Sequence, residues 1–132
     1  MRSRDDLVEV ILAVLESGDP EPITGLLTPS AVVWHNSDDV ATPAATAFQQ
    51  VRGLHALVDD LSVEVTRREP TSDGAVVQYV IRGVVRSSGS ALAARNCIFV
   101  RFEDDRIARI DEYVDPSFEA QLGVAQNRGR IA

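Results

Sequence analysis

Two segments far apart in the chain each begin as an apolar strand and end in polar and aromatic side chains. Residues 31–36 read Ala-Val-Val-Trp-His-Asn, and residues 106–115 read Arg-Ile-Ala-Arg-Ile-Asp-Glu-Tyr-Val-Asp. Such strands leave a packed core and enter a cavity, where Trp, His, Asn and Glu side chains can hold a small molecule and protonate it. The two segments therefore predict a ligand site suited to proton chemistry.

Glu112 is a candidate acid or base on the second of these strands. Side chains alternate along a strand, so Glu112 shares one face with Ile110 and Val114, whereas Asp111 and Tyr113 lie on the other. A carboxylate between two aliphatic side chains in a cavity suits proton transfer near neutral pH. If this face points outward, or if Glu112 pairs within the structure, it is a structural acid instead.

His35 is the second candidate, either as a base or as a histidine that ends a strand with one satisfied hydrogen bond. Strand alternation places it opposite Trp34 and Asn36, so only one of the two sets faces the cavity unless a bulge intervenes. We predict Glu112 and His35 as catalytic residues. We predict Trp34, Asn36 and Tyr79 as ligand-binding residues, although a core role for Trp34, a turn role for Asn36 and a core role for Tyr79 remain alternatives.

Composition narrows the possible partners. The 132 residues suit a single domain, and a net charge of −7 without any lysine argues against nucleic acid. No apolar run approaches the length of a membrane span. The single cysteine, Cys97, fits a reducing cytoplasm. The chain has no spaced His or Cys pair for a metal and no glycine-rich phosphate loop after a strand, so we expect no metal and no cofactor.

The elements that must position these residues follow from hydrophobic periodicity. Ser3 caps a first amphipathic helix that Gly18 ends, and a short helix follows the Pro-rich residues 19–22. A strand covers residues 31–36, residues 37–46 form a polar loop, and a third helix ends near Leu61. From residue 62 the period changes to two, which predicts four strands joined by short turns. These strands are Val63–Glu69, Ala75–Arg86, Ala91–Phe102 and Arg106–Val114.

This order predicts an α+β fold in which the strands pair antiparallel and the helices cover one face of the sheet. A strongly curved sheet that wraps around a long N-terminal helix leaves a cone with a pocket. The outer face, where arginines alternate with apolar residues, is either solvated or the interface of a homodimer.

The chain resembles the nuclear-transport-factor-like superfamily. The resemblance rests on the helix that ends at Gly18-Asp19, the segment Leu27-Thr28-Pro29-Ser30-Ala31-Val32-Val33-Trp34, and a meander that ends in Glu112-Tyr113-Val114-Asp115. Within the superfamily it looks most like the SnoaL-like branch, which also holds polyketide cyclases, ketosteroid isomerases and limonene epoxide hydrolases. The resemblance implies a cystatin-like α+β barrel across residues 1–132 and, usually, a homodimer.

The family patterns carry over only in part. In the steroid-isomerase pattern the base falls at His35, but the two donors that hold the enolate oxygen fall at Ile11 and Ile98. In the epoxide-hydrolase pattern Asn36 and Glu112 are kept, but Trp34 replaces the Tyr of its first strand. The Arg-x-Asp pair of that pattern falls near Tyr79 and Ile81. The cyclase pattern asks chiefly for one acid or base on the last strand, which Glu112 supplies.

Together, these features predict a domain that binds a small, largely apolar organic molecule and transfers a proton without a cofactor, as an isomerase, cyclase or hydrolase. The alternative is a non-catalytic ligand-binding or association domain of the same fold, since Ile11 and Ile98 provide no donors for an oxyanion.

Overall fold

The computed structural model describes residues 2–123, and the last residues of the expected domain, 124–132, lie outside the described residues. The first helix, α1 (Arg4–Ser17), forms as the sequence predicts. The Ser3 hydroxyl accepts a hydrogen bond from the Asp6 backbone N–H at 3.1 Å, and the Asp6 carboxylate accepts one from the Ser3 N–H at 3.2 Å. Gly18 ends the helix with a positive φ of 78°, a conformation that glycine adopts without strain.

The segment between α1 and the meander differs from its prediction in two ways. The expected loop 37–46 contains a short strand, because the chain reverses at Asp39, whose φ is 57°, and then pairs antiparallel with the preceding strand. The expected third helix is divided at Gln50 and ends four residues early, because the strand conformation already begins at Val58. The elements are η1 (Glu21–Leu26), β1 (Leu27–His35), β2 (Val40–Pro43), α2 (Ala44–Gln49) and α3 (Val51–Leu57).

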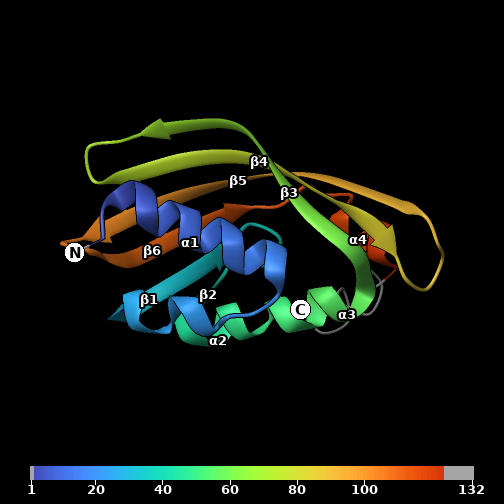
Figure 1. Cartoon of the computed structure of the whole chain (residues 1–132), viewed down its shortest axis with the longest axis horizontal. Coiled ribbons are helices and arrows are strands. Elements are labelled where there is room, and N and C mark those ends of the chain that lie inside the picture. The colour runs from blue at the N-terminus through green and yellow to red at the C-terminus, as the bar shows by residue number, and fades with distance from the viewer. Residues whose placement is uncertain (1, 124–132) are drawn as a thin grey trace.

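The four predicted strands form an antiparallel meander, as expected. They are β3 (Val58–Pro70), β4 (Gly74–Val85), β5 (Ala91–Glu103) and β6 (Arg106–Tyr113). The complete sheet has the order β2-β1-β6-β5-β4-β3 (Figure 1). Its β1–β6 pair is parallel, whereas the predicted antiparallel pairing concerned the four strands of the meander. A parallel pair needs a long crossover, and the helices and strands between β1 and β6 provide it.

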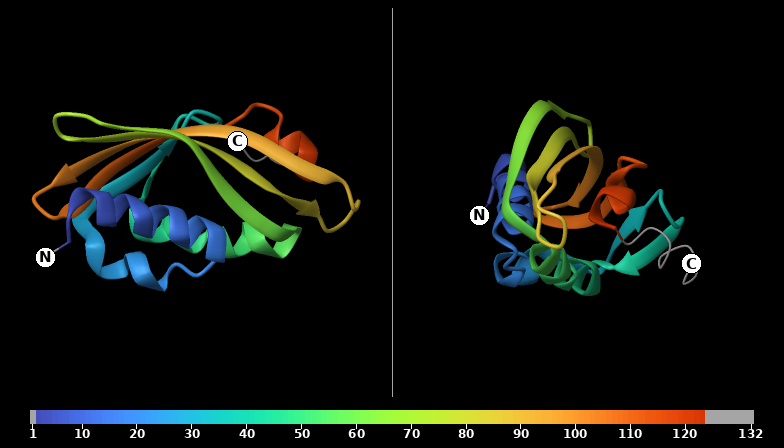
Figure 2. Two further views of the ribbon diagram at one scale, coloured as in Figure 1. Left: turned by 45° about the horizontal axis from the view of Figure 1, so that its top comes forward. Right: turned by 90° about the vertical axis from the view of Figure 1, so that its right-hand side faces the viewer.

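The sheet curves around α1, which packs with α2 and α3 on the concave side (Figures 1 and 2). The apolar stripe of α1, with Leu7, Val8 and Ile11, is buried against the inner face of the sheet. These features confirm the predicted α+β class and the curved sheet around the N-terminal helix.

A short helix that we did not predict, α4 (Phe118–Leu122), packs against β5. The Gln121 side chain holds it to β5 by accepting from the Ala93 N–H at 3.0 Å and donating to the Ala93 carbonyl at 2.9 Å. Across residues 2–123, every helix is too short or too polar to span a membrane.

Candidate active site

The parallel pairing of β1 with β6 places His35 directly beside Glu112. Strand alternation turns both side chains toward the concave face, together with Val33 and Ile110. The His35 Nε2 atom lies 2.8 Å from Glu112 Oε1, and the two side chains are 26% and 19% exposed. Two ionisable groups that are remote in sequence thus form one hydrogen-bonded pair at the cavity wall.

Tyr79, on β4, reaches the same carboxylate from the other side. Its hydroxyl donates a hydrogen bond to Glu112 Oε2, so Glu112 lies between the phenol and the imidazole. Tyr79 is only 2% exposed. Burial, followed by the negative charge of Glu112, raises the pKa of Tyr79 well above its ordinary value, so the phenol keeps its proton.

Asn96, on β5, is a cavity residue that sequence reasoning missed. It is 5% exposed, and among the described residues it is the one polar residue that is buried. Its side-chain carbonyl accepts a hydrogen bond from the Asp115 N–H at 2.9 Å, and its amide donates to Tyr79, which lies directly opposite on β4. A signal was present, because Asn96 interrupts the inward-facing apolar residues of its strand, which are Leu92, Ala94, Ile98 and Val100.

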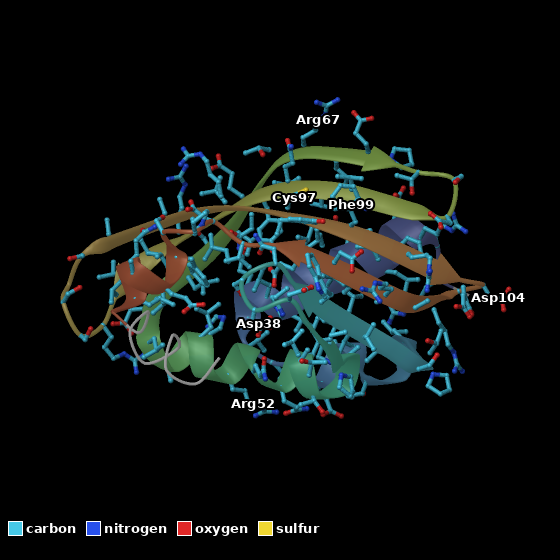
Figure 3. The ribbon with its side chains drawn as sticks, turned by 180° about the vertical axis from the view of Figure 1, so that it is seen from behind. Asp38, Arg52, Arg67, Cys97, Phe99 and Asp104 are labelled. Atoms are coloured by element: carbon cyan, nitrogen blue, oxygen red, sulfur yellow. The ribbon has the colours of Figure 1, made fainter. Side chains whose placement is uncertain are left out.

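These polar groups meet a cavity of about 480 Å³ whose other walls are mostly apolar. Ile11 and Ile98, which occupy the donor positions of the steroid-isomerase pattern, both line it. Asp38, at the turn between β1 and β2, belongs to its rim (Figure 3). The remaining aliphatic and aromatic walls come from α1, α2, α3, α4 and the sheet, and include Leu12, Leu15, Phe48, Val51, Leu54, Ile81, Ile110, Phe118 and Leu122.

Two predicted ligand-binding residues are not among the described residues that line this cavity. Trp34 points to the opposite face of β1, where its Nε1–H donates to Asp39 at 2.8 Å and its ring meets Tyr113 edge-on at 5.3 Å. Asn36 extends the β1–β6 pairing, because its N–H donates to the Glu112 carbonyl at 3.1 Å and its side-chain oxygen accepts from the Val114 N–H at 2.8 Å. Both residues hold the strand ends that carry His35 and Glu112.

Nothing in the described part of the chain gathers three His, Cys, Asp or Glu side chains at metal-binding distance. His35, Glu112, Tyr79 and Asn96 bring an imidazole, a carboxylate, a phenol and an amide to one part of a mostly apolar cavity. Such a set can exchange protons with a bound molecule and orient it through hydrogen bonds.

Solved structures share this architecture. IdmH of Streptomyces antibioticus, a proposed polyketide cyclase, is 21% identical and gives a TM-score of 0.78, with 93% of this chain and 100% of that chain covered. TsrD of Streptomyces laurentii is 23% identical, with a TM-score of 0.74 and coverage of 90% and 93%. A protein of Catenulispora acidiphila DSM 44928 with a ketosteroid isomerase-like fold, solved in complex with trimethylamine, is 15% identical, with a TM-score of 0.75 and coverage of 89% and 92%.

These structural similarities establish a common fold, but they do not identify the reaction. No functionally curated protein matches the sequence. Residues 8–110 match the SnoaL-like domain, a stretch that runs from α1 to β6 and includes His35, Tyr79 and Asn96. Because this match covers most of the chain, the protein belongs to the SnoaL-like domain family.

Proposed function

We propose that the protein binds a small, largely apolar organic molecule in the cavity and catalyses cofactor-free proton transfer with His35 and Glu112. The observation that carries this proposal is the 2.8 Å contact between His35 Nε2 and Glu112 Oε1 in the wall of a mostly apolar cavity. The likeness to IdmH, a proposed polyketide cyclase, supports a polycyclic or polyketide-derived ligand.

The contacts of Glu112 support a division of roles within the pair. Both of its carboxylate oxygens are engaged in hydrogen bonds, Oε1 with His35 and Oε2 with Tyr79. We therefore assign proton exchange with the ligand to His35 and orientation of the imidazole to Glu112. When Nε2–H of the neutral imidazole points to Glu112, the basic lone pair lies on Nδ1, and the carboxylate stabilises the imidazolium that forms.

Deuterium exchange of 2-tetralone tests this proposal, because this apolar bicyclic ketone has acidic C–H groups and exchange requires proton transfer alone. The wild type should accelerate exchange in D₂O, followed by proton NMR, whereas His35→Gln and Glu112→Gln should lower kcat by about 10²- to 10⁴-fold. Asp111→Asn is the matched control, since this neighbouring carboxylate pairs with Arg109 and lies on the other side of the strand. Equal rates in all four proteins would reject the proposed roles.

A non-catalytic binding domain is the second candidate, and one observation favours it. Ile11 and Ile98 place aliphatic side chains where steroid isomerases have oxyanion donors. If 2-tetralone and related polycyclic ketones bind without any exchange above the rate in buffer, the binding function is the better account.

We also propose that the protein forms a homodimer through the outer face of the sheet. Exposed aromatic rings cluster there, because Phe99 is 48% exposed, Tyr113 is 45% exposed, and their centroids lie 6.0 Å apart. Figure 3 shows Phe99 beside Cys97 on β5. The same face carries the Arg109–Asp111 pair, so it has charges of both signs and can meet a second copy of itself.

A cytoplasmic location stays a prediction from the single cysteine.

A further inference from the structure

The Asn96 side chain is fixed in one orientation at the cavity wall. A backbone N–H can only donate, so the 2.9 Å contact with the Asp115 N–H identifies the Asn96 carbonyl oxygen. The amide nitrogen therefore points the other way, where it donates a hydrogen bond to the Tyr79 hydroxyl. Asn96 and Tyr79 are direct neighbours across β4 and β5, so the sheet itself maintains this contact.

The Tyr79 phenol is not available as a donor to a ligand while this arrangement persists. Its single proton goes to Glu112 Oε2, and its oxygen receives the Asn96 amide. A primary amide carries two N–H groups, of which Tyr79 takes one. Because Asn96 also lines the cavity, the second N–H is a donor for a bound molecule beside the His35–Glu112 pair.

We propose that Asn96 donates its second N–H to the carbonyl oxygen of the ligand, so that the substrate class is a carbonyl compound with an acidic C–H next to the carbonyl. This inference rests on the proposed function. When His35 accepts the proton from carbon, the C–H electron pair forms the C=C bond of an enolate. The carbonyl π pair moves onto oxygen, where the Asn96 N–H stabilises the negative charge. Returning the proton from His35 to carbon completes the transfer.

The fixed orientation of the amide explains why it is suited to this role. A donor that already points at the developing charge requires no reorganisation during the reaction, and removal of one such donor typically lowers kcat by about 10²- to 10³-fold. The Asp115 N–H supplies this rigidity by holding the opposite end of the amide. Asn96 thus replaces the donors that the steroid-isomerase pattern would place at Ile11 and Ile98.

A pair of ligands with the same rings separates this role from a purely structural one. 2-Naphthol carries an oxygen like that of an enolate, whereas naphthalene has only the ring system. The wild type should prefer 2-naphthol, and Asn96→Leu should weaken its binding on the order of 10-fold while naphthalene binds unchanged. Gln78→Leu is the control, because this exposed amide lies on the outer face of β4 and should leave both affinities unchanged.

Side-chain amide NMR of the ¹⁵N-labelled wild type provides a measurement that does not depend on a folded variant. Addition of 2-naphthol, and not of naphthalene, should shift one of the two Asn96 N–H resonances downfield. Binding of both ligands without a preference for 2-naphthol, or without this shift, would reject the Asn96 donor and leave the proposed function intact. Failure of both ligands to bind would reject the apolar ligand cavity itself, and this inference with it.

Discussion

The side-chain oxygen of Asn36 accepts a hydrogen bond from the Val114 N–H at 2.8 Å, which ties the end of β1 to the residue that follows Tyr113 at the end of β6. His35 lies one residue before Asn36 on β1, and Glu112 lies two residues before Val114 on β6. The distance between the imidazole and the carboxylate therefore depends on a hydrogen bond outside the cavity.

Removal of the hydrogen bond between Asn36 and Val114 should reduce catalysis without removing the ligand site. We expect Asn36→Ala to lower the unfolding free energy by about 1 kcal/mol, the usual net contribution of one hydrogen bond, and to lower kcat for 2-tetralone exchange. The KM should change little, because Asn36 is not among the described cavity-lining residues. Urea unfolding and exchange kinetics measure these effects, and a large rise in KM with unchanged kcat would contradict this role.

Tyr79 should make the protein sensitive to alkali. The folded protein keeps the Tyr79 proton at a pH where the unfolded chain has lost it, because burial and Glu112 raise the pKa above its ordinary value of 10.0. The stability is therefore complete below pH 10.0, and it should fall above this pH by up to about 1.4 kcal/mol per pH unit.

Chemical unfolding between pH 8 and 12, about two units either side of an ordinary tyrosine pKa, measures this slope. Tyr79→Phe should reduce the slope, whereas Tyr113→Phe, which changes the only other tyrosine, should retain it. Equal slopes in the two variants would mean that the buried phenol does not control the alkaline transition.

A substitution at Gly74 tests how closely the backbones of β4 and β5 must approach each other. A Cβ atom built there would lie 1.6 Å from the Val100 carbonyl oxygen, which belongs to rigid backbone. We expect Gly74→Ala to destabilise the fold by roughly 3 kcal/mol or more, since the two strands must separate locally. Gly53→Ala is the control, because nothing lies within 4 Å of the added methyl and alanine should stabilise α3 by about 0.5–1 kcal/mol. Thermal unfolding of both variants distinguishes these outcomes.

The aromatic outer face should control the oligomeric state. We expect light scattering of the wild type at micromolar concentration to give a dimer, with an interface of about 800 Å² per subunit, and Phe99→Arg to give a monomer. Val65→Arg changes a residue of similar exposure, 41%, beside α1 and should remain dimeric. A monomeric wild type, or a monomer from Val65→Arg alone, would show that this face is not the interface.

Period-two alternation was sufficient to predict the meander and to place Glu112 on one strand face with Ile110 and Val114, although it left open which face points inward. Three of the four strands begin within a few residues of their expected positions. The first four residues of β3 were instead assigned to a helix, because Val58 and Leu61 also fit helical spacing. The parallel β1–β6 pairing was not predictable from these local patterns, because it depends on how the whole crossover folds over the sheet.

The same limit applied to the candidate site. Alternation left two sets of β1 residues open, His35 on one side and Trp34 with Asn36 on the other, and only the register against β6 brings His35 to Glu112. Tyr79 was predicted either as a ligand-binding residue or as a core aromatic, and its contact with Glu112 reaches across β5, which lies between β4 and β6. Asn96 could have been found as a polar residue in an inward-facing apolar series.

The most direct test of the central claim is a double-mutant cycle on His35 and Glu112, measured by deuterium exchange of saturating 2-tetralone. If the two side chains act as one proton-transfer unit, His35→Gln/Glu112→Gln should lose no more of kcat than the more severe single variant, because either change already disables the pair. If the two losses instead multiply in the double variant, each residue acts independently, and the proposed unit of base and orienting carboxylate is wrong.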